Sequence, residues 1–374
     1  MAAGRSRAFS SLLIALFALL AGCSSALPMC PNAKEEDMKA LETTATLYPS
    51  RFRFEVGGKV GLLDRDGHVV VPPHLEAASD DFLEGLESFR EHDLKGYIDV
   101  DGQVVIPPRF AVAGEFSEGL AAAGLPTVLD AKGRWLIGFI DRSGEFVIPP
   151  QFRFSSPFKE GLAEVGSVDD NVRRFINQKG EIALELPQYD NVGSFAHGLA
   201  YVRAGDKYGV INQQGEEVIA LQYDRIKGDF SEGLLLVEQH DVWFFIDTQG
   251  QQAFPETFEN AERFSEGRAP VEFGGKWGYI DRTGALVIEP IYDDPRWFVG
   301  GVACPGLLKE KKPKDKVETY WYGVIDPDGN MVLPFEYDSI SWFRDGLARA
   351  RKGETYGYID LSGRLIFVIP SAAQ

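Results

Sequence analysis

The sequence predicts an all-β protein, built as a tandem array of about nine antiparallel three-stranded repeats. Three observations support this fold class. A short apolar segment that ends in Asp or Asn, with Gly three residues later, recurs along most of the chain. No stretch after residue 50 has the length and the capping residues of a substantial helix. Apolar residues make up 44% of the chain, which is ample for a buried core.

The N-terminus has the layout of a secretory signal peptide. Arg5 and Arg7 precede an apolar run over residues 12–20, which is too short to span a bilayer. The run ends in Leu20-Ala21-Gly22-Cys23, which resembles the lipobox of bacterial lipoproteins. The resemblance implies that residues 1–22 are cleaved off and that Cys23 carries the lipid. An ordinary signal peptide that happens to end near a cysteine is the alternative.

The lipid determines where we expect the protein. Three acyl chains exceed the two signals that stable anchoring needs, so the protein should be attached to a membrane through its lipid alone. Ser24 follows the cysteine, whereas an Asp there usually retains a Gram-negative lipoprotein at the inner membrane. We therefore expect the bacterial cell envelope, at the outer membrane and facing the periplasm.

Charge restricts the partners. The formal net charge is −18, and removal of the signal peptide would make it more negative because that segment holds two arginines and no acid. Such a surface repels phosphate backbones and anionic headgroups. Nucleic acid is therefore not an expected partner, and another envelope protein is.

Residues 23–50 are expected to form a lipidated tether: residues 35–47 could form a short helix, but the flanking Pro28, Pro31 and Pro49 favour a tether. Cys30 in this tether and Cys304 in the array are the cysteines that remain after lipidation. In an oxidising envelope they could form a disulfide. Two unrelated thiols are the alternative, because separation in sequence says nothing about distance.

The repeat array covers residues 51–370. Its closing glycines are spaced by 35, 42, 36, 35, 35, 34, 45 and 34 residues. Chance would hardly produce such regular intervals. The recurring segments are GLLDRDG (61–67), GYIDVDG (96–102), GFIDRSG (138–144), RFINQKG (174–180), GVINQQG (209–215), FFIDTQG (244–250), GYIDRTG (278–284), GVIDPDG (323–329) and GYIDLSG (357–363).

Each segment predicts a hairpin. Asp or Asn at the first turn position and Gly at the fourth suit a type I turn followed by a left-handed residue, in which the Asx oxygen accepts a backbone amide two residues on. An apolar stretch often closed by proline comes next, and proline marks a strand end or an edge strand. Later in the unit comes Phe-x-Glu-Gly-Leu, which begins in full or nearly full form at Phe82, Phe116, Phe158 and Phe230.

The unit resembles the WG repeat family of bacteria, also called KWG repeats. Gly275-Lys276-Trp277-Gly278-Tyr279-Ile280-Asp281 matches the family pattern letter for letter, and the resemblance covers about residues 51–370. The Trp-Gly pair itself occurs once, and in the fourth and sixth units its Gly is replaced by Arg174 and Phe244. The family carries no established catalytic residues, so the resemblance implies a β-repeat architecture and a binding role.

Units of this size cannot each bury a face alone, so neighbours must stack. We expect an open or superhelical β stack, with a closed propeller-like ring as the alternative. The two long intervals place insertions around residues 125–134 and 301–319, and insertions in repeat arrays become loops on one face.

Catalytic residues, metal sites and cofactors are not expected. The first turn position holds Asp in seven copies and Asn177 or Asn212 in two, and Asn cannot act as an acid or base. Three Asp-x-Asp-Gly turns resemble the start of a calcium loop but lack the bidentate Glu at its twelfth position. The five histidines offer no ligand spacing with cysteine.

Aromatic side chains are the candidate contact residues. They could form a stripe that stacks on sugars or anchors a protein partner, or they could fill the core between stacked units. These residues are Tyr201, Trp243, Trp277, Trp297, Trp321 and Trp342. The function expected from the sequence is a non-catalytic envelope scaffold that binds a protein through its repeat surface, with a glycan or peptidoglycan binding module as the alternative.

Overall fold

The computed structural model describes residues 48–78, 82–167, 170, 172–312 and 317–370. The chain divides into residues 1–47 and a compact unit from Tyr48 onward. The signal peptide, the lipid attachment at Cys23 and the thiol of Cys30 therefore lie outside the described residues. No helix in the described part is long and apolar enough to cross a bilayer.

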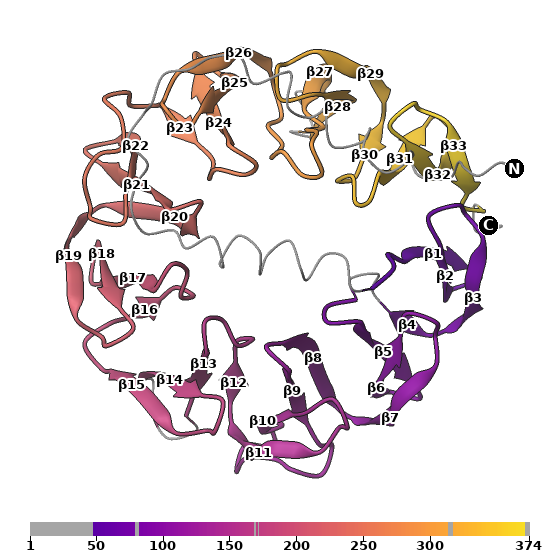
Figure 1. Cartoon of the computed structure of the whole chain (residues 1–374), viewed down its shortest axis with the longest axis vertical. Helices are drawn as coiled ribbons and strands as arrows, with labels where there is room; N and C mark the ends of the chain where they lie inside the picture. Colours follow the sequence, from indigo (N-terminus) through magenta and orange to yellow (C-terminus); the bar gives the residue numbers. More distant parts are fainter. Residues whose placement is uncertain (1–47, 79–81, 168–169, 171, 313–316, 371–374) are drawn as a thin grey trace, which may run out of the picture. The chain divides into compact units, whose positions relative to one another are not determined.

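The described residues form nine small antiparallel sheets, which we call blades 1 to 9 in chain order. Figure 1 shows that they follow one another around a ring. The strands of blades 1 to 3 are β1 (Phe52–Val56), β2 (Lys59–Leu63) and β3 (Val69–Leu75); β4 (Ala77–Ala78), β5 (Leu86–Glu91), β6 (Leu94–Asp99) and β7 (Val104–Phe110); and β8 (Val112–Ser117), β9 (Leu120–Gly124), β10 (Ile137–Ile140) and β11 (Phe146–Phe152).

Blades 4 to 6 contain β12 (Phe154–Ser155), β13 (Leu162–Gly166), β14 (Arg173–Asn177) and β15 (Ile182–Leu186); β16 (Asn191–Val192), β17 (Leu199–Ala204), β18 (Lys207–Asn212) and β19 (Glu217–Tyr223); and β20 (Arg225–Ser231), β21 (Leu234–Gln239) and β22 (Val242–Ile246). Blades 7 to 9 contain β23 (Asn260–Ala261), β24 (Arg268–Phe273), β25 (Lys276–Asp281) and β26 (Leu286–Tyr292); β27 (Gly306–Lys312), β28 (Val317–Ile325) and β29 (Met331–Tyr337); and β30 (Ser339–Ile340), β31 (Leu347–Lys352), β32 (Thr355–Asp360) and β33 (Leu365–Val368).

The blades differ from the expected three-stranded unit by one short strand. Of the nine sheets in the described residues, six have four strands. In five of these the additional inner strand is only two residues long, as in β16 and β30. Two residues cannot display the alternation of buried and exposed positions by which a strand is recognised in sequence.

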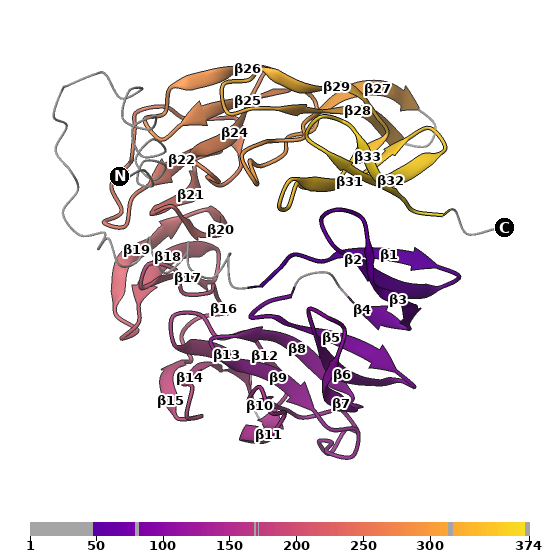
Figure 2. The ribbon, with the colours of Figure 1, turned by 45° about the vertical axis from the view of Figure 1, so that its right-hand side comes forward.

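The ring closes, so the expected open stack is wrong and the propeller-like alternative is confirmed. Phe52 of blade 1 packs edge-on against Tyr358 of blade 9, with ring centroids 5.4 Å apart. The Tyr358 hydroxyl also donates to the Arg53 carbonyl at 2.7 Å. Blades 9 and 1 are neighbours in both views (Figures 1 and 2), but they share no strand, because β1 begins one sheet and β33 ends another. Side-chain packing therefore closes the ring.

The hydrophobic core lies between neighbouring blades. One buried cluster joins Tyr97 and Ile106 of blade 2 to Phe116 and Ile140 of blade 3, and all four are at most 1% exposed. Another joins Phe52 and Phe54 of blade 1 to residues of blade 9. Because each cluster draws on two blades, no blade has a core of its own.

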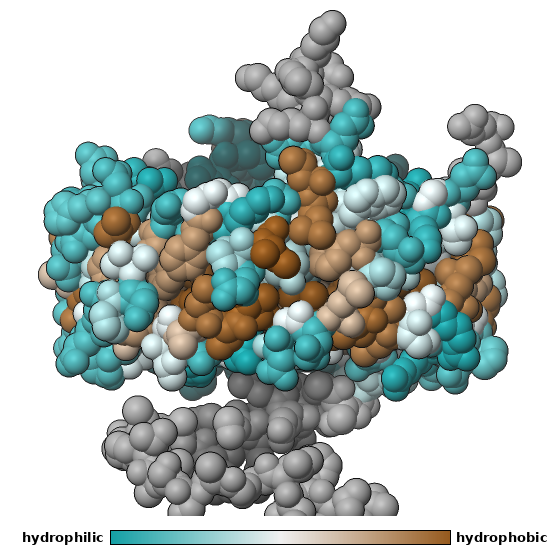
Figure 3. All heavy atoms as spheres, turned by 90° about the horizontal axis from the view of Figure 1, so that it is seen from above, coloured by the Kyte–Doolittle hydropathy of each residue, from teal (hydrophilic) through white to brown (hydrophobic). Residues whose placement is uncertain are grey.

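The outer strand of most blades is an edge strand, and proline protects it. Pro107 and Pro108 lie in β7, and Pro149 and Pro150 lie in β11. Proline offers no amide to an approaching strand, which blocks pairing between rings. The prediction that these prolines mark edges is confirmed. The outer strands form the outer wall of the ring, which Figure 3 shows from the side. Apolar side chains are nonetheless exposed on this wall: Val104 is 55% and Ile182 is 60% exposed.

Five glutamates of the Phe-x-Glu-Gly motif each bind the blade that follows their own. Both carboxylate oxygens of Glu84 in blade 2 accept the Gly119 amide of blade 3 at 3.1 Å. Glu160 of blade 4 accepts the amides of His197 and Gly198 in blade 5 at 2.7 and 2.9 Å. Glu118, Glu232 and Glu266 make the same contact with the blade that follows each of them. At the ring closure, Ser50 donates to Asp345 of blade 9.

These glutamates hold a backbone conformation that glycine would adopt more easily. Glu84 has φ 53° and Glu160 has φ 52°. A left-handed conformation costs a residue with a Cβ about 1–2 kcal/mol. The carboxylate bond to the next blade offsets this cost, so the motif serves as a joint between blades rather than as a turn alone.

Replacing Glu84 tests this joint. We expect Glu84→Ala to lower the free energy of unfolding by about 1–3 kcal/mol, because the Gly119 amide loses a charged acceptor and the left-handed φ remains. Glu84→Gly should lose about 1 kcal/mol less, because glycine accepts the φ. Chemical denaturation of both variants measures the difference. Unchanged stability of Glu84→Ala would contradict the joint.

Candidate binding site

The recurrent turn carboxylates bind their own backbone, as the Asx-turn prediction requires. The Asp99 carboxylate accepts the amides of Asp101 and Gln103 at 3.0 and 2.8 Å. Asn177 accepts the amides of Lys179 and Glu181 at 2.9 and 3.1 Å with its amide oxygen. Asp and Asn thus perform the same task in the same geometry. These oxygens are used in shaping hairpins.

One trio in the described residues has metal-ligand spacing, with ligand atoms of Asp64, Asp66 and His68 within 4.8 Å of one another. The trio belongs to a turn of this kind. Asp64 accepts the amides of Asp66 and His68 at 2.9 and 2.8 Å, and its second oxygen lies 3.1 Å from the His68 ring. The turn alone accounts for the arrangement.

Two of the six candidate aromatic residues are not available to a large ligand. Trp243 and Trp277 are 9% and 8% exposed and belong to hydrophobic clusters between blades. Each is the second residue of its strand, β22 or β25, and its side chain lies on the face that packs against the next blade. Of the two alternatives that the sequence left open for the aromatics, core packing between units describes these two positions.

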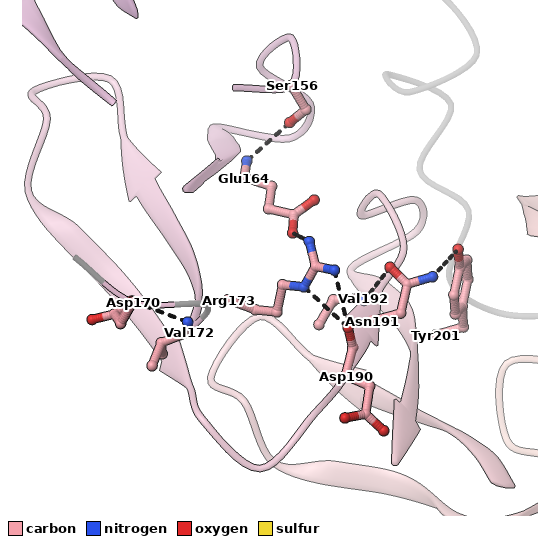
Figure 4. A network of polar contacts seen from close by, with 9 residues as sticks. All are labelled: Ser156, Glu164, Asp170, Val172, Arg173, Asp190, Asn191, Val192 and Tyr201. Atoms are coloured by element: carbon pink, nitrogen blue, oxygen red, sulfur yellow. Dashed lines mark hydrogen bonds and ion pairs between the residues drawn. The ribbon is translucent and has the colours of Figure 1, made fainter. Parts of the chain in front are cut away.

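Tyr201 and Trp321 are half-buried. Figure 4 shows the Tyr201 hydroxyl near the side-chain amide of Asn191, at 3.5 Å, beside an ion pair in which Arg173 binds Glu164 at 3.0 Å. Burial raises the pKa of Tyr201, and it also raises the pKa of Glu164 although Arg173 opposes that change. The ammonium group of Lys309 lies 3.4 Å above the Trp321 ring. Both aromatic rings are thus partly covered by their own neighbours.

Trp297 and Trp342 remain, and the structure brings them together. Their rings lie 6.3 Å apart at an interplanar angle of 32°, although they come from blades 8 and 9. Trp342 is 55% exposed. The guanidinium of Arg263 from blade 7 lies 4.6 Å above the Trp297 ring. Three consecutive blades therefore contribute one row, which we call the Trp297–Trp342 row.

The row occupies one position of the repeat. Each member directly precedes the buried motif phenylalanine of its blade, namely Phe264, Phe298 or Phe343. The other blades in which this position is described have smaller or acidic residues there. These are Glu115, Pro157, Ser194 and Asp229. Trp342 is the second residue after β30, which is the inner strand of blade 9. Figure 1 shows the inner strands on the inside of the ring.

Arg263 keeps its hydrogen-bonding capacity. Among the described residues it has the contact with Trp297 and no ion pair. Its five N–H donors and the exposed face of Trp342 are thus available to a ligand. Sequence reasoning missed Arg263, although the signal was present as a change from small or acidic residues to Arg, Trp and Trp at one repeat position.

Cys304 is buried at 3% exposure among residues of blades 8 and 9. Burial raises the pKa of its thiol to about 12. Since Cys30 lies outside the described residues, the disulfide between them stays a prediction.

The chain belongs to the family of WG containing repeats. The family matches residues 96–124, 130–166, 174–208, 208–243, 243–277, 277–304 and 322–356. Blade 1 and the last strands of blade 9 lie outside these matches, yet they have the same hairpin turns and complete the ring. The protein is thus a WG-repeat β-propeller with nine blades in its described residues.

Among the similar solved structures, the first one below supports the fold, and it supports the fold alone. A structure described as a eukaryotic initiation factor is 13% identical, with a TM-score of 0.61 over 86% of this chain and 96% of that chain. The dihydro-heme d1 dehydrogenase NirN is 15% identical, with a TM-score of 0.44 over 83% and 81%. AztD from Citrobacter koseri is 10% identical, with a TM-score of 0.39 over 86% and 94%. No curated protein matches the chain.

The turn carboxylates predict how stability depends on pH. Hydrogen bonds from Ser143 and Thr283 lower the pKa values of Asp141 and Asp281. A carboxylate whose pKa is lower in the folded protein stabilises it above the unfolded pKa of about 3.9, and this contribution is lost as the pH falls through the folded pKa. We therefore expect stability to fall below about pH 4.

The variants Asp141→Asn and Asp281→Asn should keep the turn, as Asn177 and Asn212 do, and should flatten the acid side of the profile. Denaturation midpoints between pH 2 and pH 7 measure this. An acid limb as steep as that of the unmodified chain would contradict the assignment.

Proposed function

We propose that this chain is a non-catalytic scaffold of the bacterial cell envelope, held at the membrane by lipid on Cys23, that binds a protein partner. The Trp297–Trp342 row carries the proposal. Aromatic and arginine side chains dominate binding energy at protein interfaces, and here two indoles and one guanidinium stand next to one another. A partner with an apolar group and an adjacent carboxylate fits this row.

The use of the other polar groups supports a binding role rather than catalysis. Turn carboxylates bind their own hairpins, and motif glutamates bind the next blade. An active site needs a base near a nucleophile and convergent, differing groups. In the described residues, the recurrent acids are instead distributed around the ring by repeat position.

The N-terminal motif supports the membrane attachment. Cleavage at Leu20-Ala21-Gly22-Cys23 would leave a lipidated cysteine with three acyl chains at the start of a tether of residues 23–50. Outer-membrane placement facing the periplasm rests on Ser24 in place of Asp. The acidic composition supports a protein partner over nucleic acid.

A glycan or peptidoglycan strand is the second candidate for the same row. Two neighbouring indole rings at 32° offer flat apolar faces suited to successive sugar rings. Retention of the chain on peptidoglycan is therefore measured alongside recovery of a protein partner.

The test uses the full lipidated chain in cells. After in-cell crosslinking, we expect the unmodified chain to recover a defined partner, and Trp342→Ala and Arg263→Gln to lose at least about tenfold of it, since hot-spot residues contribute 2 kcal/mol or more. Met331→Ala is the control, because Met331 is an apolar side chain of the outer strand β29 that is 64% exposed and belongs to neither proposed binding site. Equal recovery by all variants would contradict the proposal. If Trp342→Ala and Arg263→Gln lost retention on peptidoglycan and no protein partner were recovered, the second candidate would be favoured.

A further inference from the structure

The junctions between blades contain a second set of polar contacts, and at one junction the carboxylate of this contact is replaced by a cation. A carboxylate follows the last aromatic residue of most outer strands and accepts an amide from the central hairpin of the next blade. Asp190 accepts from Gly205 at 2.8 Å, and Asp338 accepts from Gly353 at 2.8 Å. Asp224 accepts from His240 at 2.9 Å.

The lysine of the repeat completes this tie. Lys207 lies 2.6 Å from Asp224, and Lys276 lies 2.6 Å from Asp293. Each pair joins the lysine of one blade to the carboxylate that holds the following blade. The Lys and Asp positions of the repeat pattern are thus structural partners.

Between blades 3 and 4 both charges are changed. Arg153 stands at the carboxylate position, and Leu136 stands at the lysine position. Of the eight outer-strand junctions, six have Asp or Glu at this position and one has Ala111. Arg153 is partly buried and has no side-chain hydrogen bond or ion pair with any residue that the structure describes. The cation Arg153 therefore occupies the position at which other junctions have a Lys–Asp ion pair.

An inserted hairpin stands beside this cation. Leu129 and Trp135 pair across it, and Trp135 is 49% exposed. The insertion was expected from the spacing of the repeats, but the position of Trp135 was not. Arg134 of this hairpin is neutralised by Asp130, whose pKa it lowers to about 2.

Arg153, Arg134 and Trp135 line one open hollow of about 410 Å³, together with Val112, Gly133 and Ile137. The lining contains two arginines and no acid, on a chain of net charge −18. Asp130 already balances Arg134. Arg153 also lines a second hollow with Asp170 and Asp190 but forms no ion pair with either described carboxylate, so its guanidinium supplies the positive charge of the first hollow. A hollow of this volume has the size of a small-molecule site rather than that of a protein interface.

We propose that this hollow binds a sugar that carries a carboxylate or phosphate group. The planar guanidinium of Arg153 matches an oxyanion through paired N–H donors. The exposed indole of Trp135 provides an apolar face for the sugar ring. The site is independent of the Trp297–Trp342 row, because it lies between blades 3 and 4.

Calorimetric titration of the full chain tests the proposal with three probes: glucuronate, glucose 6-phosphate and glucose. We expect at least one anionic sugar to bind and glucose to bind at least about tenfold more weakly, since a charged hydrogen bond is at stake. Arg153→Gln and Trp135→Ala should each weaken binding by about tenfold or more. Arg153→Asp, which restores the carboxylate of the other junctions, should abolish it.

Arg364→Gln is the control, because Arg364 is an exposed arginine of blade 9 that pairs with Asp360. It should bind as the unmodified chain does. Thermal unfolding of each variant shows that the ring is intact. Absence of heat with both anionic sugars would overturn the proposal, as would unchanged binding by folded Arg153→Gln. Acetate binding as tightly as glucuronate would overturn the role of the sugar ring.

Discussion

Face-to-face packing between blades is the interaction on which the rest of this structure depends. Each blade is a sheet of three or four short strands, and its apolar residues are buried against the next blade rather than within itself. An array built in this way leaves two unsatisfied faces at its ends. Closure of blade 1 on blade 9 removes both, through Phe52, Phe54 and Tyr358.

Polar ties convert this packing into a defined ring. Glutamates of the Phe-x-Glu-Gly motif bind the next blade through backbone amides, and Asp–Lys pairs do so at the outer-strand junctions. The most regular residues of the sequence are therefore joints. The two proposed binding sites lie where the regular pattern fails, at the Trp297–Trp342 row and at Arg153, because a residue that does not join two blades can face a ligand.

The sequence predicted the family, the strand content, the hairpin turns and the edge prolines, because turns and edges are local features. It did not predict closure, since the contact of Phe52 with Tyr358 joins residues at opposite ends of the array and depends on a small rotation repeated at every blade. The contacts of the motif glutamates could not be predicted from the sequence, because their partners lie one repeat away. Trp277 is buried and Trp342 is exposed, and the sequence did not predict this difference. The two residues occupy different positions of the repeat, one before Gly278 and one before Phe343, and the structure is needed to show which position faces the core.

A double-mutant cycle between Phe52 and Tyr358 tests the closure of the ring most directly. The variants Phe52→Leu, Tyr358→Leu and the double variant are compared by chemical denaturation. A closed ring predicts a coupling energy of about 1 kcal/mol, the usual value for an edge-to-face aromatic pair in contact. Additive effects with no coupling would contradict it, because residues at the two ends of an open array do not meet.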